Sequence, residues 1–290
     1  VALRKRKLAK APFTIIGLGK LGGSELDYGS DLDIVFVASP GARNLSNLQG
    51  LAVDIMELLS SQSELGIVFS TDARLRPDGE KGLLVNTLDA YEEYYRRRAQ
   101  LWEIQAISRT RPVAGDARIG ARFQQMAAVL TNFKSPTQPL AAWRPDWKQE
   151  IARMRERIEK ERTPAGKNAL AIKTGTGGLM DAEFIAQTFC LANGWQEANT
   201  LTALLRARNE NALPRGDADL LIENYRKLRR IEGILRRWSY AGETVLPDDP
   251  APLYRVAIRC GFASADELMA AVAEYRAAIR KVYTGVMLKG

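Results

Sequence analysis

The sequence predicts an α+β protein in which a small mixed sheet with flanking helices is followed by an all-helical bundle. Short segments rich in β-branched and aromatic residues alternate with turn residues in the first third of the chain. Beyond residue 146 the apolar residues recur at helical spacing. Residues 134–145 contain three prolines and few periodic positions, which is typical of a linker. We therefore expect a first domain at residues 1–133, a linker at 134–145 and a helical domain at 146–290.

The first domain is expected to contain three strands and a short fourth. The predicted strands are residues 13–17 (FTIIG), 31–37 (DLDIVFV), 67–76 (IVFSTDARLR) and a segment that begins near Leu83 and Val85. Residues 19–29 are rich in glycine, which predicts repeated turns.

Helical periodicity predicts further elements in both domains. In the first domain it covers residues 48–63 and 88–108, and the second helix carries a cluster of Tyr91, Tyr94, Tyr95 and Trp102. A tyrosine cluster of this kind could stack on adenine, but core packing is the favoured interpretation for residues 91–95. In the second domain we expect helices at residues 147–161, 182–192, 200–210, 218–240, 251–259 and 265–287.

Composition indicates a soluble, cytoplasmic globular protein. Of the 290 residues, 46% are apolar and 26% are charged. No apolar run is long enough to span a bilayer, and the first residues lack the apolar stretch of a signal peptide. Cys190 and Cys260 form neither a disulfide framework nor a zinc motif, and we expect both to be core thiols.

The absence of histidine excludes several kinds of catalytic site. It rules out the Ser-His-Asp triad, a Cys-His pair and a zinc site with histidine ligands. Catalysis must then depend on carboxylates, on Lys or Arg, or on a metal held by oxygen ligands. The net charge of +8 makes an anionic partner plausible.

Carboxylates lie at the start of one predicted strand and within another. Asp31 and Asp33 should project from the same face, because side chains alternate along a strand. Two carboxylates at that spacing favour a cation between them, and magnesium suits oxygen ligands while leaving room for substrate phosphates. Asp72, on the third predicted strand, would complete a two-metal site, and Arg74 and Arg76 should share its face.

A glycine-rich segment upstream predicts a phosphate-binding turn. Gly19, Gly22 and Gly23 allow backbone N–H groups to approach an anion, Lys20 adds a charge, and Ser30 can donate to a phosphate oxygen. Each signal alone has an ordinary structural explanation, such as a solvated turn or the polar face of an edge strand. Their combination favours nucleotidyl transfer, which needs a phosphate cradle, metal ligands and arginine near the leaving pyrophosphate.

Two long motifs resemble a known family. GLGKLGGSELDYGSDLDIVF followed by DARLRPDGEKGLLV resembles the catalytic core of the bacterial glutamine synthetase adenylyltransferase/deadenylylase family. That core belongs to the DNA polymerase β-like nucleotidyltransferases. WEIQAISRTRPVAGD, at residues 102–116, resembles the family's next block, and IKTGTGGLMDAEFIAQ, at residues 172–187, resembles the block that opens its helical domain.

The resemblance implies a role for each motif residue. Asp31, Asp33 and Asp72 would be the catalytic residues and the ligands of two Mg²⁺ ions, with ATP as substrate. Gly19, Lys20 and Ser30 would face the triphosphate, with Arg74 and Arg76 nearby. Apart from the resemblance, only the carboxylates offer a convincing general base, and one of them, with Asp72 as the candidate, would take the proton of the attacking hydroxyl.

The segment from Lys173 to Glu183 has two interpretations that its residues leave open. Gly175, Gly177 and Gly178 could form a backbone nest at a helix start, with Lys173 touching the nucleotide. Alternatively, the glycines form a plain loop and Asp181 is an N-cap. For Arg229, Arg230, Arg236 and Arg237, a solvated helix face is favoured over a site for an acidic partner.

The resemblance also implies a substrate and leaves the direction of transfer open. Family proteins are larger and carry two such cores, one attaching AMP to glutamine synthetase and the other removing it by phosphorolysis, so this chain resembles one half. Residues 28–33 resemble the attaching half, whereas residues 228–232 and the terminal helix resemble the removing half. We expect AMP transfer from ATP to a tyrosine of glutamine synthetase, in the regulation of nitrogen metabolism. Adenylyl removal and a degenerate nucleotide-sensing or protein-binding module are the alternatives. A signalling protein is expected as regulator, with no nucleic-acid or membrane partner.

Overall fold

The computed structural model describes residues 1–6, 13–43, 45–64, 66–67, 69–137, 139–239 and 242–288. The chain divides into two compact units. Unit 1 comprises residues 1–26, 30–144 and 190–199, and unit 2 comprises residues 27–29, 145–189 and 200–290.

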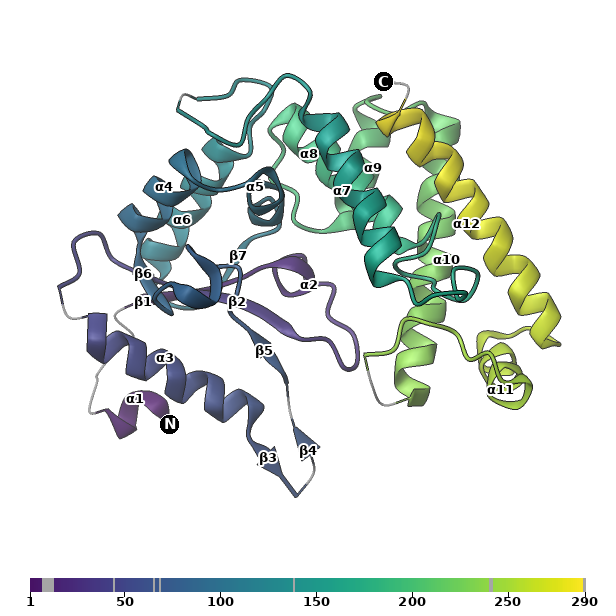
Figure 1. Ribbon diagram of the computed structural model, residues 1–290, viewed down its shortest axis with the longest axis horizontal. Coiled ribbons are helices and arrows are strands. Elements are labelled where there is room, and N and C mark those ends of the chain that lie inside the picture. The colour runs from purple at the N-terminus through teal and green to yellow at the C-terminus, as the bar shows by residue number, and fades with distance from the viewer. Residues whose placement is uncertain are drawn as a thin grey trace. The chain divides into compact units, whose positions relative to one another are not determined.

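Unit 1 is built on a five-stranded mixed sheet (Figure 1). Its strands are β1 (Phe13–Gly17), β2 (Leu32–Ala38), β5 (Thr71–Asp72), β6 (Val85–Thr87) and β7 (Arg111–Gly115). The order is β5-β2-β1-β7, and β6 also pairs with β2. β1 is antiparallel to β2 and β7, whereas β5 and β6 run parallel to β2. A separate two-stranded ribbon joins β3 (Gln62–Ser63) to β4 (Gly66–Ile67).

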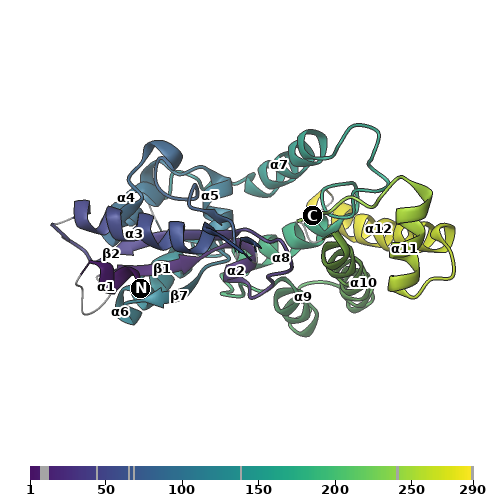
Figure 2. The ribbon, with the colours of Figure 1, turned by 90° about the horizontal axis from the view of Figure 1, so that it is seen from below.

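Helices cover both faces of this sheet. The longer ones are α3 (Leu45–Ser60), α4 (Leu88–Arg97) and α6 (Ala117–Leu130), and the shorter ones are α1 (Ala2–Lys5), α2 (Gly19–Gly22), η1 (Gly79–Lys81) and α5 (Leu101–Ile107). Figure 2 shows α3 and α6 on opposite sides of the strands. Alternation along β2 accounts for the α3 side, where Ile34 and Phe36 join Leu51 in one buried cluster.

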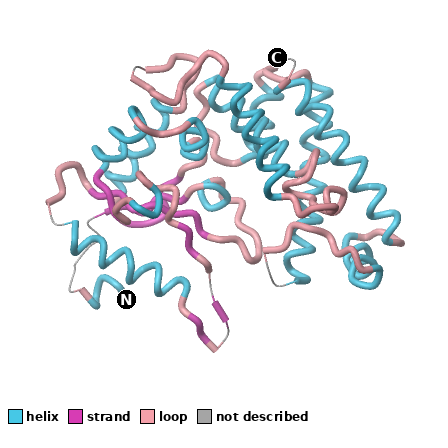
Figure 3. The backbone as a smooth tube through the Cα atoms, in the orientation of Figure 1, coloured by secondary structure: helices cyan, strands magenta, loops and turns pink. Residues whose placement is uncertain are grey.

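Unit 2 consists of helices and loops in the described part of the chain, apart from an isolated bridge between Ala171 and Val245 (Figure 3). Its helices are α7 (Trp147–Arg162), α8 (Leu179–Asn193, whose last four residues count with unit 1), α9 (Thr200–Asn209), α10 (Arg215–Ser239), α11 (Pro250–Cys260) and α12 (Ala265–Met287). The long helix α10 packs against α9, α11 and α12. No described helix combines the length and the apolar character that a bilayer crossing requires.

The predicted α+β class is confirmed, with a mixed sheet in the first part of the chain and helices in the second. The predicted third strand is wrong in extent, because among the described residues of 67–76 only Thr71–Asp72 belong to the main sheet. The predicted helix at 88–108 is interrupted at residues 98–100, where Gln100 forms a capping box with Glu103 and starts α5. Tyr91, Tyr94 and Tyr95 are buried, as predicted, while Trp102 is 45% exposed. Cys190 and Cys260 are buried free thiols, also as predicted.

Candidate functional site

The glycine-rich turn begins at Gly19, which lies directly against Asp33. Gly19 has φ +51°, and a Cβ at this position would lie 2.6 Å from Asp33 Oδ2. The N–H of Leu18 donates to the backbone carbonyl of Asp33 at 2.9 Å. Both the backbone conformation and the closeness of the carboxylate therefore require glycine here.

The other two glycines of the turn are buried among protein atoms. A Cβ on Gly22 would lie 1.9 Å from the carbonyl oxygen of Arg109, and one on Gly23 would lie 2.6 Å from the Arg109 guanidinium. Packing within unit 1 thus accounts for the absence of a side chain at both positions. Of the other residues predicted to face the triphosphate, Ser30 is buried and Lys20 is partly buried.

Two arginines that the sequence did not single out hold this turn in place. Arg109 donates from Nε to the carbonyl of Ala198 at 3.0 Å and pairs with Glu25. Arg111, on β7, donates to the carbonyls of Leu21 and Gly22 at 2.9 and 3.2 Å. Their place in the motif SRTRPVAGD was the available signal, although Arg109 precedes β7, which begins at Arg111, so that strand alternation does not relate the two side chains.

The strand register brings two of the three predicted metal ligands next to each other. β2 and β5 are parallel, and Asp33 is the register partner of Asp72. Neighbouring strands lie about 4.8 Å apart, so two carboxylates in register start from nearly adjacent backbone positions. Asp31 precedes β2, which begins at Leu32. The alternation argument that placed Asp31 on the face of Asp33 therefore does not apply, because Asp31 lies outside the strand.

Asp72 is held by Arg74. Arg74 Nε lies 3.0 and 2.9 Å from the two carboxylate oxygens of Asp72, and its Nη2 lies 2.5 Å from Oδ2. The side-chain hydrogen bonds from Arg74 hold the pKa of the Asp72 carboxyl below its usual value. The pKa of Arg74 is raised mainly by Asp72, with a smaller contribution from Asp33, so this guanidinium lies in the field of both carboxylates.

Arg76 is placed differently from the sequence prediction. β5 ends at Asp72, so Arg74 and Arg76 do not share a strand face with it. Arg76 donates to the carbonyls of Ala73, Glu80 and Gly82 at 2.6, 3.3 and 3.3 Å. It therefore closes the loop that follows β5 through contacts with the loop's own backbone.

Four of the predicted residues line one cleft of unit 1, with a volume of about 780 Å³. These are Asp31, Asp72, Arg74 and Arg76, joined by side chains of α3 that include Met56 and Glu57. The cleft thus combines carboxylates with guanidinium groups, a pattern suited to a phosphate ligand that carries a cation.

The proposed ligands, Asp31, Asp33 and Asp72, offer carboxylate oxygens, which are the type of ligand that magnesium prefers. In the described part of the chain, no three side chains of the metal-binding types come together closely enough to hold an ion. The contact between Asp72 and Arg74 explains part of this, because both oxygens of Asp72 are occupied by the guanidinium.

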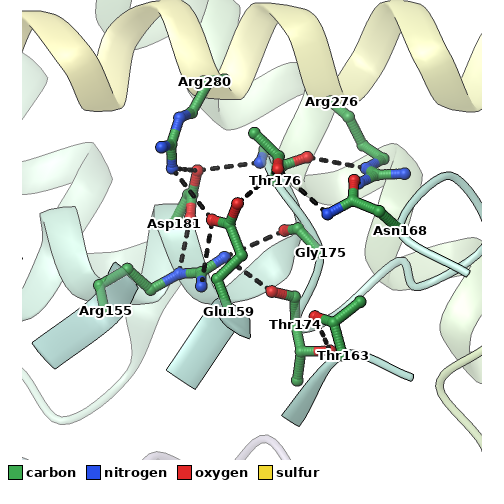
Figure 4. A network of polar contacts seen from close by, with 11 residues as sticks. Arg155, Glu159, Thr163, Asn168, Thr174, Gly175, Thr176, Asp181, Arg276 and Arg280 are labelled. Atoms are coloured by element: carbon green, nitrogen blue, oxygen red, sulfur yellow. Dashed lines mark hydrogen bonds and ion pairs between the residues drawn. The ribbon is translucent and has the colours of Figure 1, made fainter. Parts of the chain in front are cut away.

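The glycine segment of unit 2 is organised by a buried ionic network (Figure 4). Arg155 Nε lies 2.7 Å from Asp181 Oδ1, and both side chains are fully buried. Arg155 also donates to the carbonyls of Thr174 and Gly175, each at 3.0 Å. Burial raises the pKa of Asp181, whereas Arg155 and Arg280 act in the opposite direction.

This network corrects one interpretation of residues 173–183. Asp181 is the third residue of α8, so it is not the N-cap. Its Oδ2 accepts a hydrogen bond from the N–H of Gly177 at 3.0 Å. Gly177 has φ +71°, and its Cβ would lie 2.1 Å from the carbonyl of Arg276. The glycines therefore fit a loop closed on buried ions, and Lys173, partly buried beside them, keeps its nucleotide-binding role as a prediction.

The arginines of α10 are not one solvated face, contrary to the sequence interpretation. Arg236 is buried and its Nε lies 3.2 Å from the buried Glu232, which also pairs with Arg229. Arg230 and Arg237 are exposed, as expected. The difference follows from helical spacing, because positions 232 and 236 turn toward the neighbouring helices.

Both parts of the chain match described protein families. Residues 2–126 match the family described as glutamate-ammonia ligase adenylyltransferase, and residues 146–287 match the family described as GlnD PII-uridylyltransferase.

Curated relatives of this chain carry the name bifunctional glutamine synthetase adenylyltransferase/adenylyl-removing enzyme, and three of them show the extent of their similarity to it. The relative from Cutibacterium acnes is 35% identical over 272 residues, which are 90% of this chain and 27% of the relative. The relative from Mycobacterium leprae is 36% identical over 270 residues, 89% of this chain and 26% of the relative. The relative from Stenotrophomonas maltophilia (strain K279a) is 42% identical over 212 residues, 69% of this chain and 22% of the relative. The chain spans about a quarter of the length of these relatives.

Proposed function

The chain belongs to the glutamine synthetase adenylyltransferase/adenylyl-removing enzyme family of nucleotidyltransferases, and from this premise we propose that it transfers AMP from ATP to a tyrosine of glutamine synthetase. The observation that carries the proposal is the register pairing of Asp33 with Asp72, beside a cleft lined by Asp31, Arg74 and Arg76.

At the α-phosphorus, the proposed reaction forms one bond and breaks one. The tyrosine oxygen bonds to the α-phosphorus of ATP, the bond from that phosphorus to the bridging oxygen breaks, and pyrophosphate leaves. Magnesium bound by Asp31, Asp33 and Asp72 would neutralise phosphate charge and favour loss of the hydroxyl proton. Asp72 is the candidate acceptor of that proton once Arg74 releases it. Arg74, with its side chain 68% exposed, then contacts the departing pyrophosphate.

The positive charge beside the carboxylates supports a triphosphate donor. Arg74 and Arg76 both line the cleft, and Lys20 lies in the turn that begins at Gly19. Three cations suit the charge of a leaving pyrophosphate better than that of a single inorganic phosphate. Residues 28–33 resemble the attaching half of the family, which also favours AMP attachment with ATP as the donor.

Adenylyl removal is the second candidate, because residues 228–232 resemble the removing half. An experiment with two arms separates the two directions. The chain is incubated with unmodified glutamine synthetase, ATP and magnesium, and separately with adenylylated glutamine synthetase and phosphate. We expect intact mass to show added adenylyl groups in the first arm. Release of ADP in the second arm, with no addition in the first, would reverse the direction.

A further inference from the structure

A second basic hollow lies within unit 2, with a volume of about 890 Å³. Its lining comes from α10, from α11 and from the segment 27–29, and includes Arg229, Arg230, Arg237, Arg259, Trp238, Tyr28 and Asp27. Small-ligand sites commonly occupy about 300–1,000 Å³. The hollow therefore has the size of a site for a small molecule and a marked excess of guanidinium groups over carboxylates.

The helical spacing on α10 creates this hollow. Arg230, Gly233, Ile234 and Arg237 are separated by three, four and seven residues, so they form one stripe on the helix surface. Gly233 lies between Arg230 and Arg237 on this stripe and has no side chain, which leaves space between the two guanidinium groups. Glycine inside a helix costs about 1 kcal/mol relative to alanine. A Cβ there would meet only Asp27, with its nearest atom, Oδ2, at 3.4 Å, so packing does not require glycine at this position.

The arginines that line the hollow differ in whether they form an ion pair with a carboxylate. Glu232 pairs with Arg229 and with Arg236. No ion pair of Arg230 or Arg237 is present among the described residues, and Arg259 donates to the carbonyl of Arg255 at 3.0 Å. Like charges that converge from two helices repel one another, and a bound anion would relieve that repulsion.

Aromatic side chains add a second kind of contact. Tyr28 is 59% exposed, and both Tyr28 and Trp238 line the hollow. The segment that carries Tyr28 is fixed to α10, because Arg236 Nη1 donates to the carbonyl of Tyr28 at 3.1 Å. In nucleotide sites, aromatic side chains stack on the base and arginines bind the phosphates.

We propose that this hollow binds a small molecule that carries a di- or triphosphate, through the guanidinium groups of Arg230, Arg237 and Arg259. Nucleotides and inorganic pyrophosphate share this chemistry. An acidic peptide is the less favourable occupant, because an extended chain needs a longer groove than a hollow of this volume. The site consists of unit 2 residues and does not depend on the direction, or on the existence, of the proposed transfer reaction.

The test measures binding of pyrophosphate and of ATP to the full chain by calorimetry, with chelator present and no protein substrate. Arg237→Ala should weaken both ligands about tenfold or more, the effect of losing a charge-assisted hydrogen bond. Gly233→Leu should abolish binding by filling the hollow without changing net charge. This variant is expected to fold, because leucine favours a helix over glycine.

A matched control separates this site from the rest of the surface. Arg226→Ala removes an exposed arginine of α10 outside the lining and should not change affinity by more than about twofold. Tighter binding of ATP than of pyrophosphate, lost in Trp238→Ala, would assign the site to nucleotides, and equal binding would assign it to the phosphates alone. The proposal is overturned if neither ligand binds at millimolar concentration, or if Gly233→Leu binds both ligands normally.

Discussion

At Gly19, the absence of a side chain leaves room for the carboxylate of Asp33. Gly19→Ala should therefore displace Asp33 and reduce transfer, in addition to a strain of about 1–3 kcal/mol from the positive φ. Gly41→Ala is the matched control, because Gly41 also has a positive φ, +66°, but no atom within 4 Å of its Cβ position. Chemical denaturation and the transfer rate report the two effects. Equal transfer in both variants would show that the contact with Asp33 has no role.

The contact between Asp72 and Arg74 should make the stability of the folded chain depend on pH, through the carboxyl group of Asp72. Arg74 lowers the folded-state pKa of Asp72 from 3.8, so the pair contributes stability above that value and loses it as pH falls through the lowered pKa. Since Asp72 is 21% exposed and Arg74 68% exposed, the contribution should be small. NMR titration should show the pKa of Asp72 rising in Arg74→Ala. An unchanged midpoint would mean that the guanidinium does not hold the carboxylate in solution.

At the scale of elements, the network between α7, α8 and α12 predicts a large stability effect. Arg155→Met leaves the carboxylate of Asp181 buried without its nearest cation, which should cost about 3–5 kcal/mol. Arg153→Met, two residues earlier on the same helix, removes an arginine whose side chain is 65% exposed and should change stability by less than about 0.5 kcal/mol. Urea unfolding of both variants provides the comparison. Similar midpoints would mean that Arg280 alone is enough to neutralise the buried carboxylate of Asp181.

The elements that the sequence predicted well are those with a clear period. The second-unit helices begin and end near the predicted residues, and β1 coincides with the predicted strand at residues 13–17. β7 was missed because Arg111 and Pro112 at its start are atypical of a strand, and because it is an edge strand with an irregular register against β1. The third strand was overextended because residues 73–76 keep the strand pattern of DARLR, although Arg76 bonds to loop carbonyls instead.

The sequence predicts which residues form the candidate site, and only some of their contacts follow from it. It singles out Asp31, Asp33 and Asp72, and the parallel register places Asp33 next to Asp72, whereas their role as metal ligands stays a prediction. The contact of Arg74 with Asp72 and the support from Arg109 depend on side-chain and long-range contacts. Local periodicity carries no information about either.

At the scale of the whole molecule, the predicted boundary at residues 134–145 can be tested by limited proteolysis. Lys134 is exposed and should be cut by trypsin, whereas Arg144 precedes Pro145 and should resist. The fragments should remain together until denatured, because residues 190–199 pack within unit 1 and Leu191 accepts a hydrogen bond from the N–H of Phe133 at 2.9 Å. Gel filtration before and after urea treatment checks this. First cleavage within a helix of either unit would place the boundary elsewhere.

The central claim is that Asp31, Asp33 and Asp72 form a metal-dependent site for nucleotidyl transfer. Titration with Mn²⁺ in the absence of nucleotide, followed by electron paramagnetic resonance, together with an assay of AMP transfer from ATP, tests it most directly. The unaltered chain should bind Mn²⁺ and transfer AMP, whereas Asp33→Asn should lose both while keeping its thermal unfolding transition. Asp89→Asn, an exposed aspartate in the first turn of α4, should behave as the unaltered chain. Undiminished Mn²⁺ binding and turnover in Asp33→Asn would contradict the assignment of the site.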